Sequence, residues 1–437
     1  MRHPTTRSSF VLMLAGLLTA ALSVPVALAA TENRSGPEAT SGGDAGAHAV
    51  APERGTRGSA PTAPWIGSWA AAMTPAGAAG TISGAGFTDT TLRQTTHLSV
   101  GGDSLRLRIS NDFGTTALVI GSAAVSPGTA AEDPDPDQLR QVTFGGATSV
   151  SIPAGAEWVS DPVQLPVESD SDLSVSLYLP GPTGPASIHS LGLATSYRAD
   201  GDATSRPADA YEALDTSRYF LAGVDTSSNA LGSVVFFGDS ITDGYASSDD
   251  ANLRYPDQVA DRLLRRPEAL QCGVLNSGIS GNRVLEDTGT AGISALARFE
   301  DDVLDQTGVR SVVLLEGIND IARTSGALDP ASLIAVYRQF TQRAHDQGIR
   351  VVGATLTPFG GARKYNTAGE QDRQAVNFWI RTSGEFDAVI DFDAVVRDPA
   401  DPSRLKPRFD PGDHLHPNDA GYAAMAAAVN LQDICSR

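Results

Sequence analysis

The hydrophobic pattern of the chain changes near residue 229. Before that point, apolar and polar residues alternate in short runs, most strictly in Leu105-Arg106-Leu107-Arg108-Ile109. Alternation with a period of two is typical of strands that bury one face. Further runs of this kind lie at residues 92–100, 117–125, 149–152 and 173–179, separated by Gly and Pro. Residues 63–228 are therefore predicted to form an all-β domain, a sandwich of jelly-roll-like arrangement.

After residue 229, short apolar runs alternate with longer segments of helical period. The expected strands are 234–237, 274–276, 311–316, 351–355 and 388–391, and the expected helices are 256–265, 294–305, 330–347, 372–382 and 420–431. Pro417 suits the first position of the last helix. Alternation of strand and helix predicts βαβ units with right-handed crossovers. Residues 229–437 are thus predicted to form a three-layer α/β domain with a parallel sheet.

The first 29 residues have the pattern of a secretory signal peptide. Arg2 and Arg7 precede an apolar run over residues 10–22, and Ala27-Leu28-Ala29 fits a cleavage site near Ala29. An uncleaved membrane anchor is the alternative. Residues 30–62 contain little that a core would bury, and we expect a disordered linker. The mature protein is expected to be secreted.

Charge narrows the classes of partner. The chain carries a formal charge of −19, which becomes −21 when Arg2 and Arg7 leave with the signal. Such a charge argues against binding nucleic acid or anionic lipid by electrostatics. No other apolar run is long enough to cross a bilayer, so we expect no stable membrane insertion. We expect a monomer.

The chain has two cysteines, Cys272 and Cys435. In an oxidising compartment they are expected to form one intramolecular disulfide, although two buried free thiols are the alternative. The sequence contains no CxxC motif or Cys/His cluster, so neither a structural zinc site nor any other cofactor is expected. The acidic run at residues 132–137 is expected to be a solvated loop rather than a Ca²⁺ site, because its prolines prevent it from wrapping around an ion.

Candidate chemistry begins at Gly238-Asp239-Ser240, directly after the first strand of the α/β half. Ligands of such folds bind beyond the carboxyl ends of the strands, so Ser240 is expected there, at the first turn of a helix. Later loops offer the backbone N–H of Gly281 and the amide of Asn319 as donors to an oxyanion. A serine hydrolase also needs a base and a carboxylate that orients it.

The base is sought among seven histidines. His3 and His48 lie in the signal and the linker, His97 and His189 in the β half, and His345 in an expected helix. The two remaining histidines lie in the loop Asp413-His414-Leu415-His416. Asp413 and His416 are three residues apart in this loop and can form the required pair of carboxylate and base.

Taken together, these four blocks resemble those of the SGNH hydrolases, also called the GDSL esterase/lipase superfamily. The blocks are Gly238-Asp239-Ser240, Gly281-Asn282, Gly317-Ile318-Asn319-Asp320 and Asp413-His414-Leu415-His416, with Ile241 where the family has Leu. The resemblance covers residues 232–437 and implies a flavodoxin-like sheet. It implies that Ser240 is the nucleophile, His416 the base and Asp413 its orienter. It also implies an oxyanion hole made by Ser240, Gly281 and Asn319, whereas Asp239 is expected to shape the turn.

The expected function is a secreted serine esterase that acts through an acyl-enzyme. The β half is similar in arrangement to N-terminal sandwiches of some secreted SGNH carbohydrate esterases, which favours short-chain or carbohydrate-linked acyl esters. The alternatives are an extracellular lipase or phospholipase of the same superfamily, or a catalytically inert surface-binding protein. Trp65, Trp69 and Trp158 are expected in the core rather than stacked on sugars. The loops 286–292 and 360–367 are expected to line the mouth of the pocket.

Overall fold

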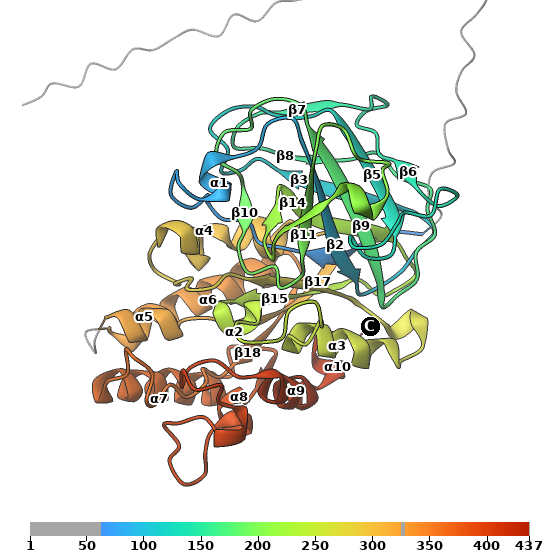
Figure 1. Cartoon of the computed structure of the whole chain (residues 1–437). Helices are drawn as coiled ribbons and strands as arrows, with labels where there is room; N and C mark the ends of the chain where they lie inside the picture. Colours follow the sequence, from blue (N-terminus) through green and yellow to red (C-terminus); the bar gives the residue numbers. More distant parts are fainter. Residues whose placement is uncertain (1–62, 325–327, 437) are drawn as a thin grey trace, which may run out of the picture. The chain divides into compact units, whose positions relative to one another are not determined.

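The computed structural model of the chain describes residues 63–324 and 328–436 (Figure 1). The predicted signal peptide and linker, residues 1–62, lie outside the described residues. Antiparallel strands fill the first half, and parallel strands with helices fill the second, as the two hydrophobic patterns predict. Within the described residues, no helix is long and apolar enough to cross a membrane.

The β half consists mainly of two antiparallel sheets that share one apolar core. Their strand orders are β1-β14-β3-β8 and β12-β11-β2-β9-β5-β6. The strict alternation of residues 105–109 places Leu105, Leu107 and Ile109 in the core, while Arg106 and Arg108 are half-buried on the other face. The bounds are Trp65–Ala70 for β1, Thr90–Leu98 for β2, Leu105–Ser110 for β3, Ser122–Pro127 for β5, Arg140–Gln141 for β6, Glu157–Val159 for β8, Ser171–Leu179 for β9, Ser196–Asp200 for β11, Glu212–Asp215 for β12 and Leu221–Ser227 for β14. The predicted all-β sandwich is confirmed.

Smaller elements complete this half. Two further strand pairs join β4 (Leu118–Ile120) to β7 (Val150–Ile152) and β10 (Ile188–His189) to β13 (Arg218–Tyr219), and α1 (Ile82–Ala85) is one short helical turn. Trp69 is buried as expected, but Trp158 is 39% exposed. The expectation of a core position for Trp158 was wrong because β8 lies at the edge of its sheet with every residue exposed.

The α/β half has a five-stranded parallel sheet in the order β16-β15-β17-β18-β19. Numbered along the chain, this order is 2-1-3-4-5, the flavodoxin-like arrangement. The strands are β15 (Ser233–Gly238), β16 (Gly273–Gly278), β17 (Val309–Leu315), β18 (Arg350–Ala354) and β19 (Ala388–Ile390). The prediction of a three-layer flavodoxin-like domain is confirmed.

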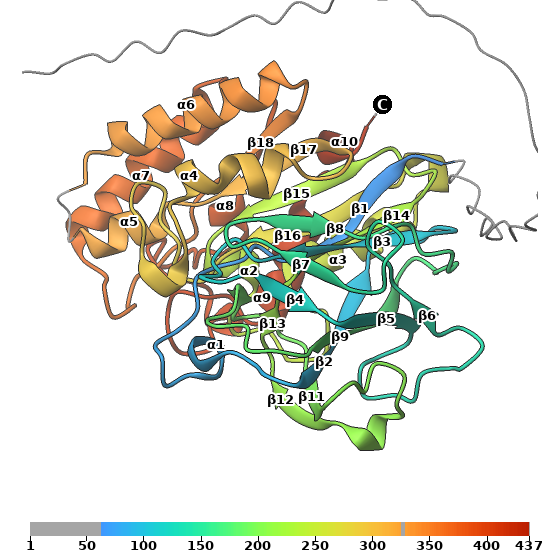
Figure 2. The same ribbon diagram turned by 90° about the horizontal axis from the view of Figure 1, so that it is seen from above.

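Helices cover the two faces of this sheet in two groups (Figure 2). The helix α3 contacts α9, and α6 contacts both α4 and α7. Right-handed crossovers require this division, because the chain moves outward from β15 to β16 and then returns in the opposite direction. The helices are α2 (Ser240–Asp243), α3 (Tyr255–Leu264), α4 (Ala295–Phe299), α5 (Ile318–Arg323), α6 (Pro330–Asp346), α7 (Thr367–Thr382), α8 (Phe392–Val396), α9 (Asp419–Ala428) and α10 (Leu431–Ile434).

Three helices differ from the sequence prediction, and one of them, α7, begins at Thr367 rather than at residue 372. The helix expected at 294–305 is α-helical only to Phe299 and continues as a π turn over Glu300–Leu304. The last helix does not begin at Pro417, because Asn418 caps it by accepting a hydrogen bond from the Gly421 N–H. Pro417 therefore precedes the cap. The helix also ends at Ala428, before the separate turn α10.

The two halves are in direct contact within one compact unit. The first strand of the sandwich, β1, packs against β16, the edge strand of the parallel sheet. Ser99 Oγ accepts a hydrogen bond from the Val274 N–H at 2.8 Å, and the Gly67 N–H donates to the Thr307 carbonyl at 3.0 Å. The sandwich thereby covers an edge that would otherwise expose unpaired backbone groups.

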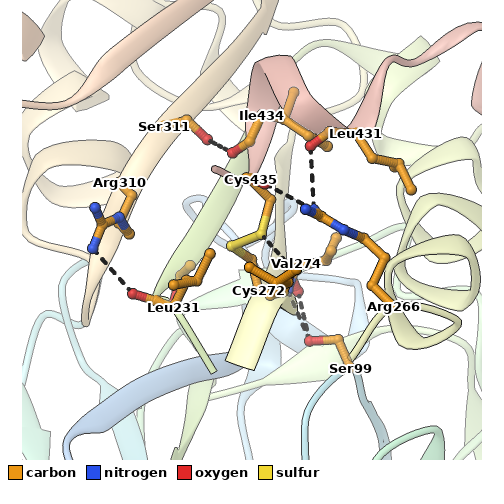
Figure 3. The surroundings of a disulfide bond; sticks show 12 residues. Ser99, Leu231, Arg266, Cys272, Val274, Arg310, Ser311, Leu431, Ile434 and Cys435 are labelled. Atoms are coloured by element: carbon orange, nitrogen blue, oxygen red, sulfur yellow. Dashed lines mark hydrogen bonds between the residues drawn. A yellow bond between two sulfur atoms is a disulfide. The ribbon is translucent and has the colours of Figure 1, made fainter. Parts of the chain in front are cut away.

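The predicted disulfide is confirmed. Cys272, just before β16, is bonded to Cys435, just after α10, across a sequence separation of 163 residues (Figure 3). Both cysteines are buried. Arg266 donates to the Cys435 carbonyl at 2.7 Å, so the end of the chain is held at the amino edge of the parallel sheet by covalent and polar contacts.

Candidate active site

Ser240 lies where the central strand β15 passes into the short helix α2. Asp239 is the N-cap of this helix, and its Oδ1 accepts a hydrogen bond from the Ile241 N–H at 3.0 Å. A Cβ atom on Gly238 would lie 2.3 Å from the Leu315 carbonyl oxygen of β17, so only glycine fits at this turn. The Gly-Asp-Ser sequence thus forms a tight strand-to-helix turn that places Ser240 at the carboxyl edge of the sheet.

The structure brings Ser240, His416 and Asp413 together. Ser240 Oγ lies 2.8 Å from His416 Nε2, and His416 Nδ1 lies 2.6 Å from Asp413 Oδ2. The second oxygen of Asp413 accepts the backbone N–H groups of Leu415 and His416 at 2.9 and 3.0 Å. Since the carboxylate fixes a proton on Nδ1, Nε2 is left as the acceptor that faces the serine hydroxyl.

The Asp413 carboxyl is held in its ionised form. Its partial burial favours the neutral acid, but hydrogen bonds from the His416 ring and from two backbone N–H groups outweigh it and lower the pKa of Asp413 to about 2. Asp413 is therefore a carboxylate at neutral pH. A positive charge that forms on His416 when it takes a proton meets this negative charge directly.

His414 is not brought to Ser240. Its Nδ1 lies 2.5 Å from Asp410 Oδ2, and its side chain is 41% exposed. Its backbone has a φ of +63°, in the left-handed region, which turns the chain between Asp413 and His416. Of the two histidines in this loop, only His416 contacts the serine.

Three hydrogen-bond donors from the sequence blocks have no acceptor among the described residues. They are the backbone N–H of Ser240, the backbone N–H of Gly281 and the Nδ2 amide of Asn319, which is buried. Gly281 has a φ of +81°, a conformation that favours glycine. A buried donor without an acceptor is costly, so such groups suit a ligand oxygen that arrives with the substrate.

Other residues of the sequence blocks hold these donors in place. Asn282 donates to the carbonyls of Ala291 and Ile293, which closes the loop after Gly281. The carboxylate of Asp320, next to Asn319, accepts the backbone N–H groups of Val284 and Leu285 at 2.8 and 3.1 Å. The two loops that present Gly281 and Asn319 are therefore tied to each other.

Two acidic side chains are buried beneath the serine turn. Burial raises the pKa of Asp239 to about 7, against the opposing hydrogen bond from the Ile241 N–H. Burial, followed by the nearby charge of Asp239, raises the pKa of Glu316 as well. Arg298 Nη2 lies 3.7 Å from Glu316 Oε2 and donates to the Gly238 carbonyl at 2.9 Å. One buried oxygen of Asp239 and one of Glu316 have no hydrogen-bond partner among the described residues, which agrees with the raised pKa of both groups.

Sequence reasoning missed one contact from the β half. His189 Nε2 lies 3.1 Å from Asp243 Oδ1, at the end of the helix that begins with Ser240. The two groups are not aligned as a good hydrogen bond, so the contact is an ion-pair contact. The other oxygen of Asp243 accepts the Ser280 N–H and hydroxyl, both at 2.8 Å. No short-range pattern links His189 to Asp243, because the contact exists only in the folded chain.

Tyr245 also escaped sequence reasoning. Its ring lies over that of His416, with centroids 4.3 Å apart, and it is 46% exposed. Its backbone carbonyl accepts the buried Tyr422 hydroxyl at 2.7 Å. Tyr245 thus covers one face of the imidazole and leaves an aromatic surface beside the serine.

A cavity of about 250 Å³ opens next to Asn319 and Asp413. The loop 360–367 lines it, as predicted, whereas within the described residues the loop 286–292 contributes no lining side chain. The lining consists of Asn319, Ala322, Arg323, Phe359, Ala362, Arg363, Lys364, Asp413 and Leu415. A second cavity of about 270 Å³, lined by Trp69, Tyr197 and Arg218, contains none of the candidate catalytic residues. Among the described residues, no cluster of His, Cys, Asp and Glu has the composition of a metal site.

Comparisons with known proteins indicate which family the α/β half resembles. Residues 236–424 match the model of the GDSL-like lipase/acylhydrolase family. A search of the curated proteins gave no match. Among solved structures, the chain is similar to a GDSL-like lipase from Bacteroides thetaiotaomicron, at 23% identity and a TM-score of 0.33 over 45% of this chain and 84% of that one.

Two further solved structures are similar to the same extent. An acetyl xylan esterase from Geobacillus stearothermophilus has 23% identity and a TM-score of 0.36, over 46% of this chain and 94% of that one. A member of the lipolytic protein G-D-S-L family from Veillonella parvula has 18% identity and a TM-score of 0.33, over 45% and 94%. The family match spans the strand that leads to Ser240, the donor loops and the loop of His416. Residues 236–424 are therefore a domain of the GDSL-like lipase/acylhydrolase type, and this match supports a carboxylic ester hydrolase.

Proposed function

We propose that the protein is a secreted serine esterase in which Ser240, His416 and Asp413 form the catalytic triad. The observation that carries the proposal is the chain of contacts from Ser240 Oγ through His416 to Asp413, at 2.8 and 2.6 Å. These distances are those of a nucleophile, a base and its orienter that are ready to react. The buried disulfide is consistent with an oxidising compartment, which supports export.

The proposed reaction has two steps. Ser240 Oγ attacks the ester carbonyl while His416 Nε2 takes its proton, and the resulting oxyanion accepts hydrogen bonds from Ser240 N–H, Gly281 N–H and Asn319 Nδ2. His416 then gives the proton to the departing alcohol, and an acyl-enzyme remains. Water, activated by His416, attacks the acyl-enzyme and releases the acid and the free serine.

We further propose that the substrates are short-chain or carbohydrate-linked acyl esters. The apolar part of the cavity beside Asn319 is small, with Ala322, Phe359, Ala362 and Leu415. This lining suits a short acyl group better than a long chain. The alternative of a lipase or phospholipase requires an extended apolar groove for a long acyl chain. The lining of this cavity does not favour that alternative.

The test compares purified wild-type protein with Ser240→Ala and His97→Gln on p-nitrophenyl esters from acetyl to palmitoyl. The proposal predicts hydrolysis that is fastest for acetyl, loss of activity only in Ser240→Ala, and labelling of Ser240 by a fluorophosphonate. His97 is the control, since it lies in the sandwich and pairs with Asp170 and Asp172. Ser240→Ala activity near the wild-type rate refutes the triad, and preference for palmitoyl refutes the proposed substrate class.

A further inference from the structure

Three cationic side chains converge on the mouth of the cavity beside the proposed oxyanion donors. Arg323 follows Asn319 by one helical turn on α5, and Arg363 and Lys364 project from the loop 360–367. All three line the cavity and all three are exposed to solvent. Arg323 comes closest to the donors, because a Cβ placed on Gly281 would lie 3.6 Å from its terminal nitrogen.

None of the three has a carboxylate partner within residues 63–324 and 328–436. No hydrogen bond or ion pair within the described part of the chain involves the side chain of Arg323, Arg363 or Lys364. Other arginines of this half, such as Arg373 and Arg381, bind carboxylates, so the three cations at the cavity differ from these in being free to meet a ligand. The one carboxylate that lines the cavity, Asp413, is already bound to His416.

The cations repel one another. Desolvation, followed by the neighbouring charges of Arg323, Arg363 and Arg283, lowers the pKa of Lys364. Clustered positive charge without a counter-ion destabilises the empty site and is relieved by an anion. Guanidinium groups also match the geometry of carboxylates.

We infer that the preferred substrate is an acyl ester of an acidic saccharide, whose carboxylate lies against Arg323, Arg363 and Lys364 while its acyl group enters the cavity. This inference rests on the proposed esterase function. A saccharide is favoured over an anionic membrane because, among the large exposed apolar side chains of the described residues, only Tyr245 is shown beside the site, whereas adsorption to a bilayer surface uses an extended apolar face.

The first experiment measures kcat/KM for a matched pair of small acetyl esters, 4-acetoxybenzoate and the neutral 4-acetoxybenzamide. The inference predicts a preference of about tenfold for the carboxylate ester at low ionic strength, and a decline of this preference at high salt because surface charges are screened. Equal rates for the two esters at low salt overturn the inference and leave the esterase proposal intact. If the wild type hydrolyses neither ester at any of several pH values, the result counts against the esterase proposal itself.

The second experiment uses variants. Neutralising all three cations together, as Arg323→Gln, Arg363→Gln and Lys364→Gln, is expected to bring the ratio of the two rates to about one. Arg265→Gln removes one exposed positive charge at the end of α3, at the opposite edge of the sheet, and is expected to leave the ratio unchanged. A ratio that survives in the triple variant overturns the inference.

The third experiment identifies the source of the anion. Acetate release is compared for partially acetylated polygalacturonate and for acetylated xylan of equal acetyl content. Faster release from polygalacturonate supports the inference, and faster release from xylan contradicts it. If phosphatidylglycerol vesicles are hydrolysed faster than either polymer, the cations bind a membrane headgroup, and the inference is overturned.

Discussion

His189 of the sandwich contacts Asp243 of the catalytic half at 3.1 Å, three residues after Ser240. The other ring nitrogen of His189 lies 2.9 Å from the Ala72 carbonyl oxygen. Both neighbours of the ring are oxygen atoms, and the contact with Asp243 has the distance of an ion pair without the alignment of a hydrogen bond. Through its second oxygen, Asp243 holds Ser280, the residue before the proposed oxyanion donor Gly281. The β half therefore braces the loop that presents this donor.

Replacement of His189 tests this bracing role. We expect His189→Ala to lower kcat roughly 10- to 100-fold with little change in KM, because a misplaced Gly281 N–H weakens binding of the transition state more than of the substrate. His189→Gln keeps a donor of similar size and is expected to recover part of kcat. The control is His97→Gln, which changes another histidine of the sandwich that pairs with a carboxylate, Asp172. A loss confined to thermal stability, with kcat unchanged, would contradict a positioning role.

The two histidines of the 413–416 loop are distinguished by a second pair of variants. We expect His416→Ala to lower kcat/KM for p-nitrophenyl acetate at least about 10³-fold, since it removes the base, and His414→Ala to lower it less than about tenfold. His414 is exposed and bound to Asp410, so its loss affects only the shape of the loop. The reverse ranking would move the role of base to His414.

Some of this site could be predicted from the sequence, and some could not. The turn at Gly238-Asp239-Ser240 and the spacing of Asp413 and His416 depend on local geometry, so the residues alone indicate them. The contact of His189 with Asp243, the ring of Tyr245 over His416 and the cations at the cavity mouth depend on tertiary packing between distant segments. For the same reason, the sequence does not indicate that Asp239, an ordinary cap in local terms, is buried without a partner for one oxygen.

Asp239 gives the stability of the protein a pH dependence. Because burial raises its pKa to about 7, the folded state binds a proton that the unfolded chain releases near pH 4. The stability from this proton is fully present below pH 4 and is lost as the pH rises through about 7. Asp239→Asn keeps an oxygen for the Ile241 N–H and cannot ionise. We expect the free energy of unfolding of the wild type, measured in urea, to fall between pH 5 and pH 8 by on the order of 1 kcal/mol or more beyond the change seen in Asp239→Asn. Equal pH dependence of the two proteins would show that Asp239 is ionised at both.

The disulfide is expected to stabilise the fold without taking part in the chemistry. Cys272 precedes β16 at the amino edge of the parallel sheet, whereas Ser240 follows β15 at the carboxyl edge. The bond closes a loop of 163 residues, and loss of such a bond typically costs 2–5 kcal/mol of unfolding free energy. We expect the double variant Cys272→Ala, Cys435→Ala to show this loss in urea unfolding, while its kcat at 25 °C stays within about twofold of wild type. Dithiothreitol is the matched control, since it should destabilise wild type by the same amount and leave the double variant unchanged. A large loss of kcat in a variant that remains folded would contradict this separation, because it would show that the amino edge of the sheet controls the geometry around Ser240.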